Sequence, residues 1–304
     1  MDSAKRDALL SKLKGVVRNE IKISCVKSDA PLDVCASRVG GEPGVPADFV
    51  WPRYSYTQSR SWLSAFFATK KSKKEEVVSE PLKFVAQINL KDVAALDEDN
   101  LLPKSGTLCF FYALEATGFD PKDKGAARVF YFADESELTI ANPPDELDEA
   151  SLTSEYSLTF ERRPSLPGVF ELSEYVDFND EDEEVYPDVY EDCCEELGLK
   201  KDEWTDDVKL LGYPNIVQNP MEEECEYVTR GFYMGEGRPN LVPEERTKIE
   251  EAAKDWILLF QLASFEGEDL DAIFGDCGHI YFWIKKEDLL KRNFDDIWLI
   301  LQCD

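Results

Sequence analysis

The segment Pro81 to Ala113, PLKFVAQINLKDVAALDEDNLLPKSGTLCFFYA, decides the predicted fold because its pattern recurs further along the chain. A strand-like run with a central glutamine, Gln87, is followed after 19 residues by Gly106, which opens an aromatic run. In the second copy, Gln261 is the central glutamine of WILLFQLA and is followed after 17 residues by Gly278 in GHIYFWI. The recurrence predicts an internal duplication.

A glycine-containing turn precedes each copy at a similar distance. Gly40 in RVGGEPGVP lies 47 residues before its glutamine, and Gly212 in LLGYPNIVQ lies 49 residues before its own. We therefore expect a single domain over residues 1–304, with related halves at about 38–133 and 210–303. An acidic middle segment, about 134–209, joins them.

Hydrophobic periodicity predicts an α+β fold that is rich in β structure. Each half offers three strands in similar order, which favours antiparallel or mixed sheets with a few peripheral helices. The predicted strands are Ile21 to Val26, Phe84 to Leu90, Gly106 to Leu114, Ala127 to Ala133, Tyr156 to Arg162, Ile257 to Ala263, His279 to Ile284 and Ile297 to Cys303. The predicted helices are Asp2 to Glu20, Asp188 to Leu197, Pro243 to Lys254 and Lys286 to Lys291.

The net charge limits the classes of partner. The chain has 34 Lys and Arg against 63 Asp and Glu, a formal charge of −29. Such a surface repels phosphate backbones and anionic lipids, so we expect neither nucleic acid nor membrane as a partner. A basic protein remains a suitable partner.

Three features of the sequence predict a cytoplasmic location. The residues following Met1 are charged and lack the apolar core of a secretory signal. The longest uncharged apolar stretch, Trp256 to Phe265, is far shorter than the roughly 20 residues that a membrane helix needs. The eight cysteines form no Cys-x-x-Cys pair, and without export we expect them to be thiols.

The acidic charge is concentrated in one segment. Glu174 to Asp207 contains sixteen Asp or Glu and two Lys, about half of the net charge of the chain. A calcium loop beginning at Asp177 is a weak alternative, because Asp182 stands where an EF-hand needs glycine. We expect a solvated loop or a docking face for a basic partner, with its centre at the residues Glu181, Asp182, Glu183 and Glu184.

Few residues suggest catalysis. The only histidine, His279, excludes multi-histidine zinc centres and leaves at most one Ser-His or Cys-His pair. Gln87 and Gln261 are polar residues in apolar strands, and these are costly unless hydrogen-bonded. Each therefore either anchors a loop or lines a pocket between the halves. The candidate ligand-binding residues are Gln87, Gln261, Asp276 and His279; no cofactor or metal is expected, and no catalytic residue can be assigned.

Several motifs resemble the YwqG-like proteins, a family of uncharacterised, mainly bacterial cytosolic proteins. They are RVGGEPGVPADFVWP from Arg38, PLKFVAQINL from Pro81, LLPKSGTLCFFY from Leu101, LLGYPNIVQ from Leu210, WILLFQLAS from Trp256 and FGDCGHIYFWIKKEDL from Phe274. The resemblance implies a single cytosolic α+β domain rich in β structure. It supplies no established catalytic residues.

Two functional hypotheses follow. The first is a non-enzymatic cytosolic protein that binds another protein, for instance as an inhibitor or an immunity-like factor, through its acidic segment. The second is a small-ligand-binding protein, or a hydrolase that uses carboxylates, with a cleft between the two halves.

Overall fold

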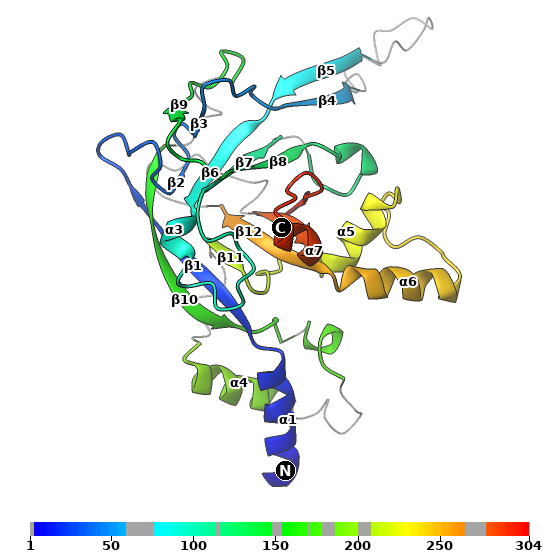
Figure 1. Cartoon of the computed structure of the whole chain (residues 1–304). Helices are drawn as coiled ribbons and strands as arrows, with labels where there is room; N and C mark the ends of the chain where they lie inside the picture. Colours follow the sequence, from blue (N-terminus) through cyan, green and yellow to red (C-terminus); the bar gives the residue numbers. More distant parts are fainter. Residues whose placement is uncertain are drawn as a thin grey trace, which may run out of the picture.

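The computed structural model describes residues 3–58, 76–113, 116–147, 154–169, 171–177, 186–199, 208–264 and 278–303. Ten strands form one antiparallel sheet in the spatial order β14-β13-β12-β11-β1-β10-β2-β6-β7-β8 (Figure 1). They are β1 (Arg18–Lys27), β2 (Arg38–Val39), β6 (Lys83–Asn89), β7 (Thr107–Tyr112), β8 (Ala127–Phe132), β10 (Tyr156–Ser165), β11 (Val208–Leu211), β12 (Trp256–Ala263), β13 (His279–Lys285) and β14 (Trp298–Gln302). A sheet-dominated α+β fold is therefore confirmed.

The centre of the sheet is the long pair β1 and β10. Their register runs from Arg18 opposite Ser165 to Lys27 opposite Tyr156, and β11 and β2 pair with their outer sides. The predicted helix Asp2 to Glu20 is too long, because α1 (Ser3–Gly15) ends at its glycine and β1 begins at Arg18. Pairing on both sides of β1 outweighs the helical periodicity of its first residues.

The sheet order is mirrored about this central pair. From β10 the strands β2, β6, β7 and β8 follow toward one edge, and from β1 the strands β11, β12, β13 and β14 follow toward the other. The irregularity in β6 lies between Phe84 and Ala86, and the one in β12 lies between Leu258 and Phe260. Each precedes a central glutamine. The short strands β2 and β11, which the periodicity did not predict, complete this order.

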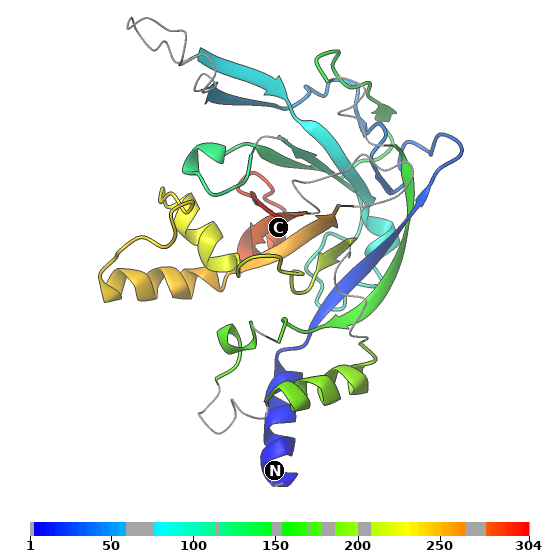
Figure 2. The same cartoon turned by 180° about the vertical axis from the view of Figure 1, so that it is seen from behind.

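The sheet curls until its two arms face each other, so that it resembles a nearly closed barrel (Figures 1 and 2). Phe110 of β7 packs against Phe260 of β12 and Phe282 of β13, with ring centroids 4.7 and 5.2 Å apart. Because apolar side chains cover both faces of these strands, β6, β7, β12 and β13 are almost entirely buried. This explains why they read as nearly continuous apolar runs.

The chain after β7 bridges the gap between the two edge strands. The backbone N–H of Leu301 on β14 donates to the carbonyl oxygen of Thr117 at 2.9 Å. The indole Nε1 of Trp298, also on β14, donates to the carbonyl oxygen of Gly118 at 2.9 Å. This contact between the two arms, where β8 and β14 are the edges, is called the seam below.

The remaining elements lie around the sheet. The helix α1 packs on α4 (Tyr186–Leu197), which confirms the helix predicted in the acidic segment, and the two share a separate apolar cluster. The β4–β5 ribbon extends from the body in Figure 1. The other elements are β3 (Gly44–Pro46), β4 (Arg53–Gln58), β5 (Glu76–Pro81), β9 (Leu138–Ile140), α3 (Leu90–Val93), α5 (Glu222–Thr229), α6 (Pro243–Ala253), α7 (Lys286–Leu290), η1 (Pro121–Asp123) and η3 (Leu172–Glu174).

The structure also bears on the expectations about membrane helices and cysteines. Among the described residues, no helix is both long and apolar enough to cross a bilayer. The seven cysteines in the described part of the chain are free thiols, and four of them are buried. Burial raises the pKa of Cys25 to about 12, so this thiol remains protonated at neutral pH.

Candidate functional site

Gln87 of β6 is fully buried and anchors the loop on both sides of β2. Its Oε1 accepts a hydrogen bond from the backbone N–H of Gly44 at 2.7 Å. Its Nε2 donates to the carbonyl oxygens of Val34 and Ala36, at 2.8 and 2.9 Å. The side chain therefore satisfies three backbone groups of a loop that has no regular partner strand there.

Gln261 of β12 is also fully buried and has a related role. Its Oε1 accepts from the backbone N–H of Asn215 at 2.8 Å, and its Nε2 donates to Oδ1 of the same residue at 3.2 Å. The hydroxyl of Tyr281 on β13 donates to the carbonyl oxygen of Asn215 at 2.5 Å. Gln302 of β14 anchors the next part of the loop, accepting from the N–H groups of residues 217 and 218.

The two glutamines point away from the interior where the arms meet. Gln261 follows Phe260 in a strand, and neighbouring residues in a strand point to opposite faces. Gln87 is opposite Cys109, which precedes Phe110, and the same alternation applies there. Their contacts thus favour the loop-anchoring alternative. Four strands, β2, β10, β1 and β11, separate β6 from β12 in the sheet.

Of the other predicted site residues, the structure describes only His279. His279 begins β13, is 5% exposed and stacks on Tyr281 with ring centroids 5.9 Å apart. It lies on the same face as Gln261, because Gln261 is opposite Tyr281. Asp276 lies outside the described residues, and so do the predicted docking residues Glu181, Asp182, Glu183 and Glu184. Their roles stay predictions.

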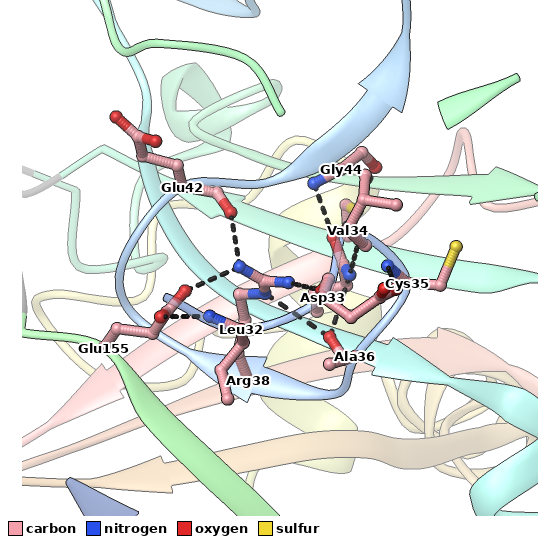
Figure 3. A network of polar contacts seen from close by, with 11 residues as sticks. Leu32, Asp33, Val34, Cys35, Ala36, Arg38, Glu42, Gly44 and Glu155 are labelled. Carbon is pink, nitrogen blue, oxygen red and sulfur yellow. Dashed lines mark hydrogen bonds and ion pairs between the residues drawn. The ribbon is translucent and has the colours of Figure 1, made fainter. Parts of the chain in front are cut away.

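A buried arginine organises the loop that Gln87 anchors (Figure 3). Arg38 of β2 is 1% exposed, and its Nη1 lies 2.6 Å from Oε1 of Glu155. It also donates to the carbonyl oxygens of Asp33 and, at 3.2 Å, Glu42. Glu155 accepts in addition from the backbone N–H of Leu32 at 3.0 Å. This network ties the strand that precedes the glycine turn to the start of β10.

A second buried ion pair lies between β1 and β11, just as the first lies between the start of β10 and β2. Glu20 of β1 is 2% exposed and contacts Lys209 of β11 at 3.2 Å, and it also pairs with Arg163 of β10. Burial alone would raise the pKa of Glu20, but the charges of Lys209 and Arg163 outweigh this effect and the pKa is lowered. A Cβ at Gly212, which has φ of +73°, would lie 2.5 Å from the Cβ of Glu20.

A pocket of about 350 Å³ lies at the seam, on the side of the strand ends that meet α5 and α7. This seam pocket has walls from both arms of the sheet. The lining residues are Pro121, Lys124, Gly125, Ala127, Arg128, Val228, Thr229, Gly231, Trp256, Lys285, Asp288, Asp295, Asp296, Ile297 and Trp298. Its size is within the range of small-molecule sites.

The seam pocket contains charges of both signs. Arg128 of β8 is exposed, and among the described residues no carboxylate lies within ion-pairing distance of its guanidinium. Lys124 contacts Asp296 at 4.0 Å across the seam, an exposed and weak pair. Asp288 accepts a hydrogen bond from Nδ2 of Asn293 at 3.0 Å. The pocket therefore offers hydrogen-bond donors and acceptors that are not all used within the protein.

The inner wall of the seam pocket is fixed by a buried carboxylate, Glu226 of α5. It accepts from Nζ of Lys285 at 2.9 Å, from Nε1 of Trp256 at 2.9 Å and from Arg230 at 2.6 Å. Burial would raise the pKa of Glu226, but these hydrogen bonds outweigh it and hold the pKa below its usual value. The carboxylate of Glu226 thus balances the charge of Lys285, whose Nζ lies 5.4 Å from the centroid of the Trp256 ring.

The sequence gives no signal for this pocket. Its residues come from the β7–β8 connection, the end of α5, the start of β12, the end of β13 and the segment before β14. No fixed spacing connects these segments. The pocket lies between the two arms of the sheet, and its lining includes none of Gln87, Gln261 and His279, near which the cleft was predicted. Within the described ranges, no three His, Cys, Asp or Glu side chains are grouped so as to hold a metal ion.

Comparison with known proteins places the chain in a family without assigning a function. A search of curated proteins finds no match. A family model described as "Domain of unknown function (DUF1963)" matches residues 37–303, which includes every strand of the sheet except β1. On this match over most of its length, the chain belongs to the DUF1963 family of uncharacterised domains.

Proposed function

We propose that this protein is a non-enzymatic binding protein whose ligand binds in the seam pocket. The observation that supports the proposal best is the position of this pocket between the two arms of the curled sheet. Small-molecule sites are frequent at such interfaces and in the mouths of barrels. The lining combines six charged side chains with the indole rings of Trp256 and Trp298, so charged and aromatic groups from both arms meet there.

The lining of the pocket favours binding over covalent catalysis. It contains no serine, cysteine or histidine, and the hydroxyl of its threonine, Thr229, donates to backbone carbonyl oxygens within α5. His279 is buried in the sheet beside Tyr281 and is not part of the lining. Nζ of Lys285 is engaged by Glu226 at 2.9 Å. A hydrolase that uses two of the aspartates is the less favoured alternative for this pocket.

A thermal-shift screen of the full chain with a panel of polar metabolites tests the proposal. A ligand at 100 times its Kd adds about 2.7 kcal/mol to native stability, which is readily measured. The substitution Thr229→Trp, in the lining, should abolish the shift because the indole fills the pocket. The matched control is Glu251→Trp on the exposed side of α6, which should preserve it. A silent panel, or a shift that persists in Thr229→Trp, would contradict the proposal.

Recognition of a basic protein through the acidic segment is a second candidate function. It is supported by the concentration of sixteen Asp or Glu in residues 174–207. Changing Glu181, Asp182, Glu183 and Glu184 to their amides should slow association with a captured basic partner and weaken its dependence on salt. Unchanged association rates would remove this candidate.

We also propose that the domain consists of two related halves that arose by internal duplication. The mirrored strand order, the irregularity before each glutamine and the two loop anchors support this view. In this arrangement the first strand of each half, β1 or β10, pairs with the second strand of the other half. Residues 1–147 and 154–304, produced as separate chains, should therefore fold only when co-expressed. A fragment that folds alone would contradict this interleaving.

Two finer assignments stay predictions from the sequence. They are a closer relation to the YwqG-like proteins within the family and a cytoplasmic location. Fractionation of cells that produce the full chain would test the location.

A further inference from the structure

We infer that the seam pocket selects a small zwitterion of the amino-acid type, with its carboxylate on Arg128 and its ammonium group on Asp295 and Asp288. The inference rests on the proposed function, and it names the class of ligand. Three features carry it, namely a guanidinium without a carboxylate partner among the described residues, two aspartates without an ion pair there, and two indoles whose N–H groups are already used.

The guanidinium of Arg128 provides the anion subsite. It belongs to β8, and a Cβ placed on Gly125 would lie 3.3 Å from its Nη2, so the glycine leaves space for it. The φ of Gly125 is +90°, a conformation that disfavours any other residue there. Within the described part of the chain the guanidinium has no carboxylate partner. A planar guanidinium binds a carboxylate with two parallel hydrogen bonds, which a lysine cannot do.

The aspartates provide the cation subsite. Asn293, which lies between α7 and β14, orients the carboxylate of Asp288 and fixes the backbone at Asp295. Its Nδ2 donates to Oδ1 of Asp288 at 3.0 Å, and its Oδ1 accepts from the backbone N–H of Asp295 at 3.3 Å. Neither aspartate has an ion pair among the described residues, whereas Asp296 contacts Lys124. Two carboxylates without a cation suit an ammonium group, which carries three donors.

The indoles suit the apolar side chain of the amino acid. The N–H of Trp256 is used by Glu226 and that of Trp298 by the carbonyl oxygen of Gly118, both at 2.9 Å. Their contribution to the pocket is consequently apolar surface. Ammonium groups also interact favourably with aromatic faces.

The charge balance of the lining separates a zwitterion from a simple ion. The lining has three Lys or Arg and three Asp, but Lys285 pairs with Glu226 and Lys124 contacts Asp296, which leaves Arg128, Asp288 and Asp295 for a ligand. The field of the whole protein opposes the approach of a free anion. A free cation would be attracted, but it would leave Arg128 without a partner in the pocket. A ligand with both charges satisfies both subsites and has no net charge.

Calorimetric titration of the full chain tests the inference with three probes of similar shape. L-phenylalanine is the zwitterion, phenethylamine lacks the carboxylate and 3-phenylpropanoate lacks the ammonium group. The remaining amino acids are titrated as well, so that the test does not depend on one side chain. We expect at least one amino acid to bind, and its matched amine and acid to bind at least 10-fold more weakly.

Three variants locate the subsites. Arg128→Gln and Asp295→Asn should each weaken binding of the amino acid at least 10-fold, because each removes one charge contact. The control Lys248→Gln, on an exposed position of α6, should leave it unchanged. The exposed positions of Arg128 and Asp295 let these variants keep the wild-type melting temperature, which shows that the fold is retained.

The outcomes distinguish this inference from the proposed function. If an amine or an acid binds as tightly as its amino acid, or if Arg128→Gln binds normally, the inference is wrong while a pocket function stands. The same holds if no amino acid binds but another compound gives a shift that Thr229→Trp abolishes. If no compound binds in either experiment, both proposals are overturned.

Discussion

The two halves of the sheet anchor their loops with the same residue type but by different means. Gln87 holds backbone groups on both sides of β2, and Arg38 with Glu155 reinforces the same loop. Gln261 holds Asn215, and Gln302 on a separate strand holds the following residues. In both halves a buried polar side chain therefore supplies the hydrogen bonds that a loop crossing the sheet would otherwise lack.

The two buried ion pairs differ in how deeply their carboxylates are buried. In the N-terminal half Arg38 is buried, but its partner Glu155 has a side chain that is 19% exposed. In the pair between β1 and β11 both Glu20 and Lys209 are almost fully buried, with side chains that are 2% and 4% exposed. The outer faces are also covered differently, by the segment with Phe49 and Trp51 in one half and by the helix α5 in the other.

The largest expected effect comes from removing the more deeply buried carboxylate. Glu20→Gln should lower the free energy of unfolding by about 3–5 kcal/mol, because it removes the carboxylate charge that the buried ammonium group of Lys209 contacts. Glu155→Gln should cost less, about 1–2 kcal/mol, because Arg38 keeps its carbonyl partners and the site is closer to water. Urea unfolding of both variants at pH 7 gives the comparison, and equal losses would contradict it.

The pH dependence sharpens this prediction. The folded-state pKa of Glu20 is lowered below its usual 4.5, so its stabilising contribution is present above that value and is lost as the pH falls through the folded-state pKa. The difference in stability between wild type and Glu20→Gln should therefore shrink progressively below about pH 4.5. A difference that stays constant down to pH 2 would show that the lost hydrogen bonds, and not the charge, matter.

The next effect concerns the glutamine anchors. Gln87→Met should cost about 2–3 kcal/mol, because the backbone groups of Gly44, Val34 and Ala36 lose their partner while the side-chain volume is kept. Gln261→Met should cost about 1–2 kcal/mol, since Tyr281 continues to hold the carbonyl oxygen of Asn215. Thermal unfolding measures both. A larger loss for Gln261→Met would show that its loop is the more important one.

The smallest effect is expected from Glu224 of α5, a feature of the C-terminal half alone. Burial raises the pKa of Glu224 to about 7, with Arg238 opposing the shift. A raised folded-state pKa means that stability is fully present below about pH 4.5 and is lost as the pH rises to about 7. Glu224→Gln should thus become more stable than wild type by on the order of 1–2 kcal/mol at pH 8, with little difference at pH 4.5.

This effect is measured by unfolding both proteins across the pH range. The matched control is Glu251→Gln on α6, an exposed glutamate that should show no such trend. If wild type and Glu224→Gln respond identically between pH 4.5 and 8, the carboxylate of Glu224 has better access to water than its position on α5 indicates.

The sequence by itself determined the sheet-forming segments and the family. Alternation and aromatic runs placed β6, β7, β8, β12, β13 and β14 to within a few residues, because strands of this length carry their own periodic signal. The central glutamines identified where loops are anchored, since a polar residue in an apolar strand requires a partner. The motifs indicated an uncharacterised family, which the match over residues 37–303 confirms.

Only the tertiary structure decided how these segments meet. The short strands β2 and β11 have too few residues for a period, and β1 is a strand from Arg18 because β10 and β11 pair with it on both sides. The seam pocket depends on the curl of the sheet, which brings Arg128 of β8 near the residues before β14. That curl results from the packing of Phe110 on Phe260 and Phe282, contacts between residues more than 100 positions apart, which no local pattern can encode.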